Sequence, residues 1–310
     1  MNPFLSVIVP LFNEELVIGK MHETLTSVLQ DRINYEVIMV NDGSEDGTLK
    51  LAKEICRRDP RIKLISFSRN FGHQSAITSG LDRAGGEIMV VIDADLQDPP
   101  GVILDMIEKW KQGYHVVYGV RKNRKGESVF KLITASIFYR VLRKMTSVDI
   151  PVDAGDFRLM DRRVVDQLKR MREKSRFVRG MVSWVGFKQT EIEYFRETRF
   201  AGATKYPFKK MLKFAIDGIL SFSQFPLKIS GIFGFLCCIV SFLMIVYGLV
   251  SKFIYPESTL SGWTSIFIAI LFIGGVQLIT IGVLGEYIGR IYEESKGRPI
   301  YIVDEEINFQ

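Results

Sequence analysis

Short apolar runs alternate with amphipathic segments along residues 1–198 of the 310-residue chain. The runs are rich in Val, Ile and Leu, as strands are, and they lie at Leu5–Val9, Tyr35–Val40, Ile62–Ser66, Glu87–Ile92 and Val116–Tyr118. Segments between them, such as 16–29 and 48–56, place apolar residues at helical spacing. This alternation predicts an α/β domain with a mostly parallel sheet, in which ligands bind at the carboxyl ends of the strands.

Two long uncharged runs follow, at residues 229–251 and 258–285. Each is longer than the roughly 20 residues that an apolar helix needs to cross a bilayer core. A pair of buried core helices is the alternative, but uncharged stretches of this length are uncommon in soluble domains. We therefore predict transmembrane helices over 229–251 and 263–285, with an external loop over 252–262 and a cytosolic tail over 286–310.

Positive charge predicts the orientation of these helices. The loop between them carries one Lys and one Glu, whereas Lys and Arg gather before the first run and after the second, at Arg199, Lys205, Lys209, Lys210, Lys213, Lys228, Arg290, Lys296 and Arg298. Because cytoplasmic flanks carry the excess of Lys and Arg, we expect the N-terminal domain and both termini in the cytoplasm. The sequence thus predicts a multi-pass protein of the cell (inner or plasma) membrane.

The juxtamembrane segment, residues 199–228, has its own pattern. Apolar positions recur at helical spacing, and Lys209, Lys210 and Lys213 lie on the remaining face. This predicts an amphipathic helix that lies on the inner membrane surface and binds membrane lipids through its lysines. A helix packed on the globular domain is the alternative.

Overall charge and cysteine content exclude some classes of protein. The net charge of +6 is compatible with nucleic acid, an anionic membrane or a phosphorylated substrate as partner. Because the basic residues gather at the membrane junction and no nucleic-acid-binding module is recognisable, we expect no nucleic-acid partner. Cys56, Cys237 and Cys238 form no paired framework, which argues against disulfides and a zinc site.

Three of the predicted strands end in polar motifs. Pro10-Leu-Phe-Asn-Glu-Glu15 follows the first strand, Asn41-Asp-Gly-Ser44 the second and Asp93-Ala-Asp-Leu-Gln97 the fourth. Because the carboxyl ends of parallel strands face the same crevice, we expect one composite site. The G-x-G-x-x-G fingerprint is absent after the first strand, which argues against a nicotinamide or flavin dinucleotide.

The acidic motif indicates a metal site. On a continuing strand Asp93 and Asp95 would point to the same face, and two carboxylates with open positions beside them suit Mg²⁺ or Mn²⁺ holding a diphosphate. A solvated loop is the alternative. Asp98, which precedes two prolines, is expected to end the loop and start the next helix.

These motifs, in this order, resemble those of family 2 glycosyltransferases of the GT-A fold. More closely, the chain is similar to membrane-anchored polyprenyl-phosphate glycosyltransferases such as dolichol-phosphate mannose synthases and bacterial undecaprenyl-phosphate glucosyltransferases. The other matching motifs are Arg69-Asn-Phe-Gly72, Gly155-Asp-Phe-Arg158, Gly202-Ala-Thr-Lys-Tyr206 and Leu284-Gly-Glu-Tyr-Ile-Gly-Arg-Ile-Tyr292. The chain departs from the family at Asn41, where many relatives have Asp, and at 202–205, where many have Gly-Glu-Ser-Lys and this chain lacks the carboxylate.

The resemblance implies roles for particular residues. Those expected to hold the nucleotide sugar are Pro10, Phe12, Glu14, Asp42 and Asp93, and those expected to hold Mg²⁺ or Mn²⁺ with the diphosphate are Asp93, Asp95 and Gln97. The resemblance therefore also implies a catalytic role for Asp95. Asp156 is implied to orient the acceptor or to act as the base, with Asp153 as its competitor. A structural role for Asp156, such as capping a helix or pairing with Arg158, is the alternative.

A phosphate-bearing acceptor requires cations near the membrane. Arg121, Lys131 and Arg199 are the candidates, because guanidinium and ammonium groups bind phosphate well. For each of them a solvated surface charge or attraction to lipid headgroups is the alternative.

The resemblance implies an inverting transferase that moves one sugar from a nucleotide sugar to polyprenyl (undecaprenyl) phosphate. Its product would be a lipid-linked monosaccharide for cell-envelope and cell-wall glycans. UDP-glucose ranks first among the donors, followed by UDP-N-acetylglucosamine and then GDP-mannose or UDP-aminoarabinose. One alternative is a processive polysaccharide synthase, but the presence of only two spans and the absence of Q-x-x-R-W disfavour it. Another is a lipid-sugar flippase or membrane scaffold, which the absence of charged residues in the spans disfavours. Small residues in the spans leave a homo-oligomer open.

Overall fold

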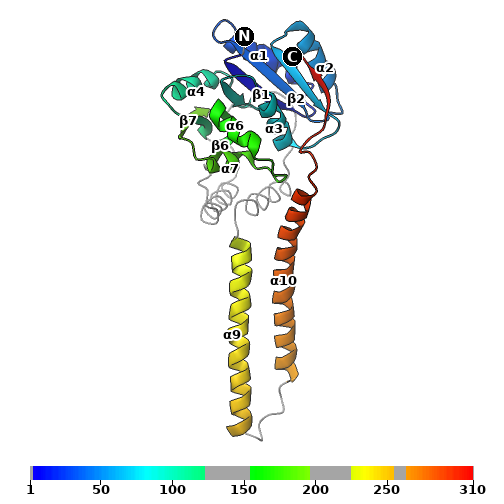
Figure 1. Ribbon diagram of the computed structural model, residues 1–310, viewed down its shortest axis with the longest axis vertical. Coiled ribbons are helices and arrows are strands. Elements are labelled where there is room, and N and C mark those ends of the chain that lie inside the picture. Colours follow the sequence, from blue (N-terminus) through cyan, green and yellow to red (C-terminus); the bar gives the residue numbers. More distant parts are fainter. Residues whose placement is uncertain (1–2, 123–153, 196–224, 255–262, 310) are drawn as a thin grey trace.

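The computed structural model describes residues 3–122, 154–195, 225–254 and 263–309 (Figure 1). In these residues a mixed sheet of eight strands forms the centre of the N-terminal domain, in the order β7-β5-β6-β4-β1-β2-β3-β8. The strands are β1 (Leu5–Leu11), β2 (Tyr35–Asn41), β3 (Ile62–Phe67), β4 (Ile88–Val91), β5 (Val116–Lys122), β6 (Ala154–Asp161), β7 (Gln189–Phe195) and β8 (Val303–Ile307). The predicted α/β class and the five predicted strands are confirmed.

The middle of the sheet is parallel. β1 pairs in parallel with both β2 and β4, and β2 pairs in parallel with β3. β6 runs antiparallel to β4 and β5, and β8 runs antiparallel to β3. Every residue of β1 and β2 is buried, because helices cover both faces of these strands.

Six described helices of the domain form two layers. The α1, α2 and α4 helices contribute to one apolar cluster on the sheet, and α3, α6 and α7 contribute to the other. Their bounds are Ile18–Leu29 (α1), Thr48–Arg58 (α2), His73–Arg83 (α3), Val102–Lys111 (α4), Arg162–Arg170 (α6) and Val178–Trp184 (α7). Gly80 brings α3 close to β1, because a Cβ there would lie 2.3 Å from a methyl carbon of Ile8. The second half of α3 thereby packs directly against the middle of β1.

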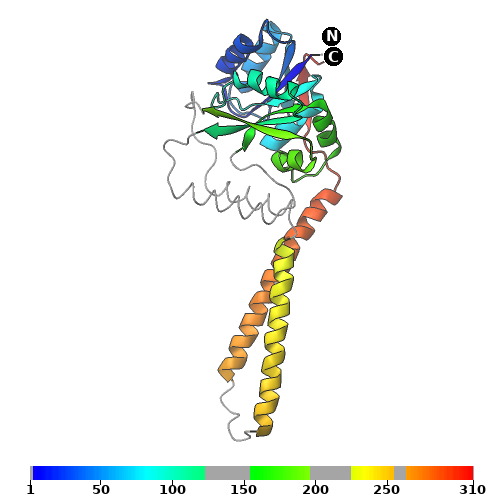
Figure 2. The same ribbon diagram turned by 90° about the vertical axis from the view of Figure 1, so that its left-hand side faces the viewer.

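Two long helices extend side by side away from the domain, α9 (Phe225–Ile254) and α10 (Trp263–Ser295) (Figures 1 and 2). In the part of the chain that the structure describes, one stretch, Phe272–Ser295 in α10, is long and apolar enough to cross a membrane. A second crossing through α9 stays a prediction. Most of the predicted external loop and of the predicted juxtamembrane helix lies outside the described residues, but residues 252–254 and 225–228 belong to α9.

After α10 the chain returns to the domain and ends as β8 on the edge of the sheet (Figure 1). Tyr301 stacks on Phe67 with ring centroids 5.1 Å apart, and its hydroxyl donates to Asp82 at 2.8 Å. The Nδ2 of Asn308 donates to the carbonyl oxygens of Cys56 and Ile62 at 2.9 and 2.7 Å. These contacts tie the C-terminal segment to helices and strands near the N-terminus.

We expect Asn308→Asp to destabilise this attachment. Asn308 has a φ of 63°, which Asp tolerates, but a carboxylate cannot donate to the two carbonyl groups and would repel them. Losing such contacts costs about 1–3 kcal/mol, so the melting temperature of the purified protein in detergent should fall. Gln30→Glu adds the same charge at an exposed position at the end of α1, where the helix dipole opposes it by only about 0.3–1 kcal/mol, so the melting temperature should fall less. Equal melting temperatures for the two variants would contradict the prediction.

Candidate active site

The polar motifs after β1, β2 and β4 meet at one edge of the sheet, as the sequence predicted. Leu11 at the end of β1 lies opposite Asn41 at the end of β2. Ile92, just after β4, donates its backbone N–H to the carbonyl of Ile8 at 3.0 Å. The parallel register thus brings three loops from distant parts of the sequence to the same crevice.

The loops after β1 and β2 are bound to each other. The backbone N–H of Asn13 donates to the hydroxyl of Ser44 at 3.0 Å, and that of Glu14 donates to the hydroxyl of Thr48 at 2.7 Å. Phe12 is exposed at this edge, whereas Pro10 is buried within β1. The structure therefore places the predicted nucleotide-binding motif on a loop with defined backbone geometry.

Asp42 joins these loops to the segment before α3. Its buried carboxylate accepts the backbone N–H of Phe71 at 2.6 Å and that of Gly72 at 3.0 Å. Burial raises the pKa of Asp42 above its ordinary value, although the two backbone hydrogen bonds and His73 oppose the shift. Gly43 permits the close approach, because it has a φ of +64° and a Cβ there would lie 2.4 Å from the backbone of Arg69. In this structure Asp42 organises the crevice, and its contact with a nucleotide stays a prediction.

The acidic motif is a turn and not a continuing strand. β4 ends at Val91, Leu96 has a φ of 58°, and the backbone N–H of Gln97 donates to the Asp95 carboxylate at 3.1 Å. The prediction that Asp93 and Asp95 share one face of an extended strand is therefore wrong. Both side chains are half-buried at the crevice. Because they lie on a turn, their directions do not follow the alternation of a strand.

The charge around Asp93 is consistent with a cation site. Burial raises the pKa of Asp93 to about 6; His73 opposes the shift, and the neighbouring carboxylates Asp156, Asp98 and Asp95 add to it. Oxygen donors from two carboxylates and an amide suit Mg²⁺ or Mn²⁺. Among the described residues no three Asp, Glu, His or Cys side chains form a metal-binding group. A cation held by Asp93, Asp95 and Gln97 would therefore complete its shell with substrate phosphate oxygens and water.

Asp98 makes buried contacts with side chains of two strands and does not start a helix. The cap residue of α4 is Gly101, so the prediction that Asp98 begins this helix is wrong. Asp98 is buried, accepts a hydrogen bond from the Tyr194 hydroxyl and lies 3.5 Å from Nη2 of Arg121. Arg121, a predicted phosphate contact, also donates from Nε to Tyr194 at 3.2 Å. Its guanidinium thus ties β5 to β7 and to the acidic turn.

Lys131 and Arg199, the other two candidates for the acceptor phosphate, lie outside the described residues, as does Asp153.

Asp156 on β6 is surrounded by donors. Nε and Nη2 of Arg179 donate to its two oxygens at 2.8 and 3.2 Å. Nε2 of His73 lies 3.2 Å from Oδ2, and Nε2 of Gln74 donates to the same oxygen at 3.4 Å. Arg158 instead donates to the carbonyl of Gly155 at 2.8 Å, so the alternative of an Asp156–Arg158 pair is wrong.

These contacts determine how Asp156 titrates. Burial would raise its pKa, but the charge of Arg179 and the hydrogen bonds from His73 and Arg179 hold the pKa well below the ordinary value. Burial would lower the pKa of His73, but its bond to Asp156 and the charge of Asp93 raise it to about 9. A carboxylate with so low a pKa is a weak proton acceptor, which favours an orienting role for Asp156 over that of a base.

His73 and Arg179 are site residues that the sequence analysis missed. His73 follows the Arg69–Gly72 motif directly, which could have marked it as the start of a helix at the crevice. Arg179 lies in α7 without a motif of its own, and only the packing of α7 beside α3 and β6 brings it to Asp156.

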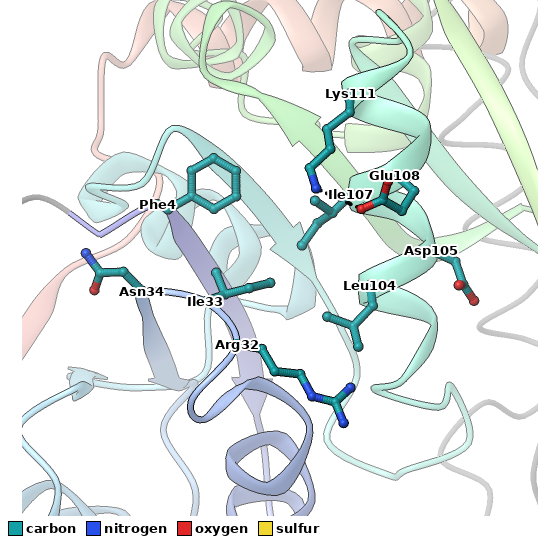
Figure 3. Close-up of a pocket in the computed structure, with 9 residues that line it drawn as sticks. All are labelled: Phe4, Arg32, Ile33, Asn34, Leu104, Asp105, Ile107, Glu108 and Lys111. Carbon is teal, nitrogen blue, oxygen red and sulfur yellow. Dashed lines mark hydrogen bonds and ion pairs between the residues drawn. The ribbon is translucent and has the colours of Figure 1, made fainter.

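A separate cavity of about 560 Å³ lies between α4 and the segment before β2 (Figure 3). Phe4 and Asn34 line it, and they precede β1 and β2 directly. The cavity therefore lies at the amino ends of the parallel strands, opposite the edge that carries the acidic turn. It is not part of the candidate active site.

The sequence of this domain matches a known family. The model of "Glycosyl transferase family 2" matches residues 6–169, which extend from β1 into α6 and include all three polar motifs and Asp156. The chain belongs to glycosyl transferase family 2. The expected glycosyltransferase class and the GT-A-like α/β fold are thereby confirmed.

Relatives of this family 2 enzyme align over nearly the whole chain. An uncharacterized glycosyltransferase of Bacillus subtilis is 56% identical over 96% of this chain and 92% of its own length. The bactoprenol glucosyl transferase of Shigella phage SfV is 41% identical over 97% of this chain and 98% of its own. A mycobacterial protein of known structure is similar in fold, with a TM-score of 0.50 and 20% identity, over 71% of this chain and 74% of its own.

We expect the stability contributed by Asp156 to depend on pH at both ends of the range. Its folded pKa lies below the ordinary 3.8, so its contribution is full above that pH and is lost as the pH falls through the folded pKa. The pKa of His73 is raised from 6.5 to about 9, so its contribution is full below pH 6.5 and is lost as the pH rises through about 9.

The melting temperature of metal-free protein should therefore differ most between wild type and Asp156→Asn from about pH 4 to about pH 6.5. The difference should shrink below that window, and in part above it, since Arg179 keeps its charge. Thermal unfolding in detergent with EDTA measures it. Asp105→Asn, at an exposed position, is the control, and a difference for Asp156→Asn that did not vary with pH would contradict the prediction.

Proposed function

We propose that this protein transfers one sugar from a nucleotide sugar to a polyprenyl phosphate, with inversion at the anomeric carbon. The observation that carries the proposal is the acidic turn at Asp93, which lies 3.7 Å from His73 in a crevice that also holds the ionised Asp156. The same chain has an apolar helix long enough to cross a membrane. The relative named bactoprenol glucosyl transferase supports a polyprenyl acceptor and glucose as the sugar.

The donor would lie over the loops after β1, β2 and β4. Phe12, Glu14 and Asp42 would hold the base and ribose, and Pro10 would direct the loop that carries Phe12. Asp93, Asp95 and Gln97 would hold Mg²⁺ or Mn²⁺, which neutralises the charge that develops on the departing diphosphate.

The acceptor needs little help from a base. A phosphate monoester has its second pKa near 6 and is mostly ionised at neutral pH, so its oxygen can attack the anomeric carbon directly. This agrees with the low pKa of Asp156, which we propose does not take up a proton and orients the acceptor through the donor side chains Arg179 and His73 that it holds in place. Arg121, Lys131 and Arg199 remain the proposed phosphate contacts. Arg121 would have to share its guanidinium between Asp98 and the phosphate.

The membrane would supply the acceptor from its cytoplasmic side. We propose that residues 229–251 and 263–285 cross the bilayer and that the segment 199–224, which precedes α9, lies on its inner surface. We propose undecaprenyl phosphate as the acceptor, UDP-glucose as the donor and cell-envelope glycan as the destination of the sugar.

A donor panel tests the proposed reaction. The purified full-length protein is incubated with undecaprenyl phosphate, Mg²⁺ or Mn²⁺ and, in separate reactions, UDP-glucose, UDP-N-acetylglucosamine, GDP-mannose or UDP-aminoarabinose. Mass spectrometry of the lipid fraction should detect one hexose on undecaprenyl phosphate with UDP-glucose. No lipid-linked sugar from any donor would overturn the proposal, and products with several sugars would favour a polymer synthase.

We expect Asp93→Asn and Asp95→Asn each to lower the turnover number at least tenfold. Each removes a charged oxygen donor from the proposed cation site, and even the loss of a group that only supports a metal ligand costs about 10–100-fold. Initial rates at several Mn²⁺ concentrations measure the effect, and more Mn²⁺ should restore part of it. Asp105→Asn is the matched control, since it removes an equal charge at an exposed position of α4. Unchanged activity in both site variants would exclude the proposed metal role.

A further inference from the structure

Asp156 is held by side chains from two helices on the same face of the sheet. Arg179 reaches it from α7 with the two-pronged geometry that matches a carboxylate. Gln74, in the first turn of α3, uses both ends of its amide: Nε2 donates to Asp156 at 3.4 Å, and Oε1 accepts the backbone N–H of Val178 at 2.9 Å. The start of α7, the start of α3 and the Asp156 carboxylate therefore hold one another in place.

The Arg179–Asp156 pair differs from an ordinary surface ion pair. The Asp156 side chain is 9% exposed and that of Arg179 is 22% exposed. Arg163 makes a similar two-pronged contact with Asp161 at the start of α6, but its side chain is 65% exposed. Exposed pairs contribute little, whereas removing one partner of a buried pair leaves a charge without compensation. The chain thus offers a matched comparison between two similar pairs.

The held carboxylate has a defined relation to the acidic turn. Nε2 of His73 lies 3.2 Å from Oδ2 of Asp156 and 3.7 Å from Oδ1 of Asp93. One imidazole therefore spans the space between the two carboxylates. Under the proposed function, Asp93 serves the donor diphosphate and Asp156 serves the acceptor, so the spacing between these residues determines how the two substrates meet.

Resting on the proposed function, we propose that Arg179 is a positioning residue for sugar transfer. Together with Gln74, Arg179 holds Asp156 in place relative to Asp93, with His73 between the two carboxylates. This arrangement aligns the acceptor with the anomeric carbon of the donor sugar. A misplacement of about 1 Å in such a site can cost about 100-fold in rate. The loops proposed to hold the nucleotide base are also fixed by bonds between themselves, so we expect donor affinity to change little when Arg179 is replaced.

The test separates turnover from donor binding. Arg179→Gln should lower kcat for undecaprenyl phosphate glucosylation about 100-fold and leave the KM for UDP-glucose within about twofold of wild type. Arg179→Lys keeps the charge but loses the planar fork, and its kcat should lie between those of Arg179→Gln and wild type. Titration of UDP with Mn²⁺ by calorimetry should give the same affinity for all three proteins.

A double variant shows whether the pair acts as a unit. Asp156→Asn combined with Arg179→Gln should be no slower than the slower single variant, because both changes remove the same alignment. Arg163→Gln is the matched control, since it removes the similar fork at Asp161, and it should keep the wild-type kcat. Melting temperatures of all variants show whether each is folded.

The possible failures are distinct. Suppose that the wild type transfers sugar. The positioning role is then overturned, and the proposed function stands, if Arg179→Gln keeps the wild-type kcat or is no slower than Arg163→Gln. The same holds if Arg179→Gln loses donor affinity as strongly as it loses turnover. If the Asp156 and Arg179 variants have additive effects, the two residues do not act as a unit and the inference also fails. If wild type transfers no sugar from any donor, the proposed function itself fails and the inference fails with it.

Discussion

The parallel register of β1 with β2 and β4 is the constraint on which the candidate site depends. Leu11 lies opposite Asn41, and Ile8 lies opposite Val91, so the three polar motifs leave the sheet at the same edge. Helices on both faces bury these strands completely, which makes a slip in register costly. The loops can therefore carry polar side chains without disturbing the framework that holds them.

Electrostatic compensation is the second constraint on the crevice. Four carboxylates, Asp93, Asp95, Asp98 and Asp156, influence one another there, and described cations offset two of them: Arg121 faces Asp98, and Arg179 faces Asp156. His73 lies between Asp93 and Asp156. Burial, to which the neighbouring carboxylates add, raises the pKa of Asp93. A divalent cation with a diphosphate, as proposed above, would stabilise the charged form of this carboxylate.

Part of the site could be predicted because its signals are local. The polar motifs stand next to their strands in the sequence, and the topology of an α/β sheet places strand ends together. The prediction of a shared strand face for Asp93 and Asp95 failed because β4 ends two residues before Asp93. The helix-starting role of Asp98 failed because its partners, Arg121 and Tyr194, come from β5 and β7, which no local pattern connects to it.

The sequence by itself determined the first five strands and their order, but it did not indicate β6, β7 and β8. The β-rich runs, helical periodicities, long apolar runs and motifs of the family 2 domain that it showed are all properties of neighbouring residues. Only the tertiary structure decided which side chains meet. Asp156 and Arg179 are 23 residues apart, Asp156 and His73 are 83 apart, and Asn308 binds the carbonyl of Ile62 from 246 residues away. Hydrophobic patterning determines which face of an element is buried, whereas pairing between buried polar groups depends on how those faces pack.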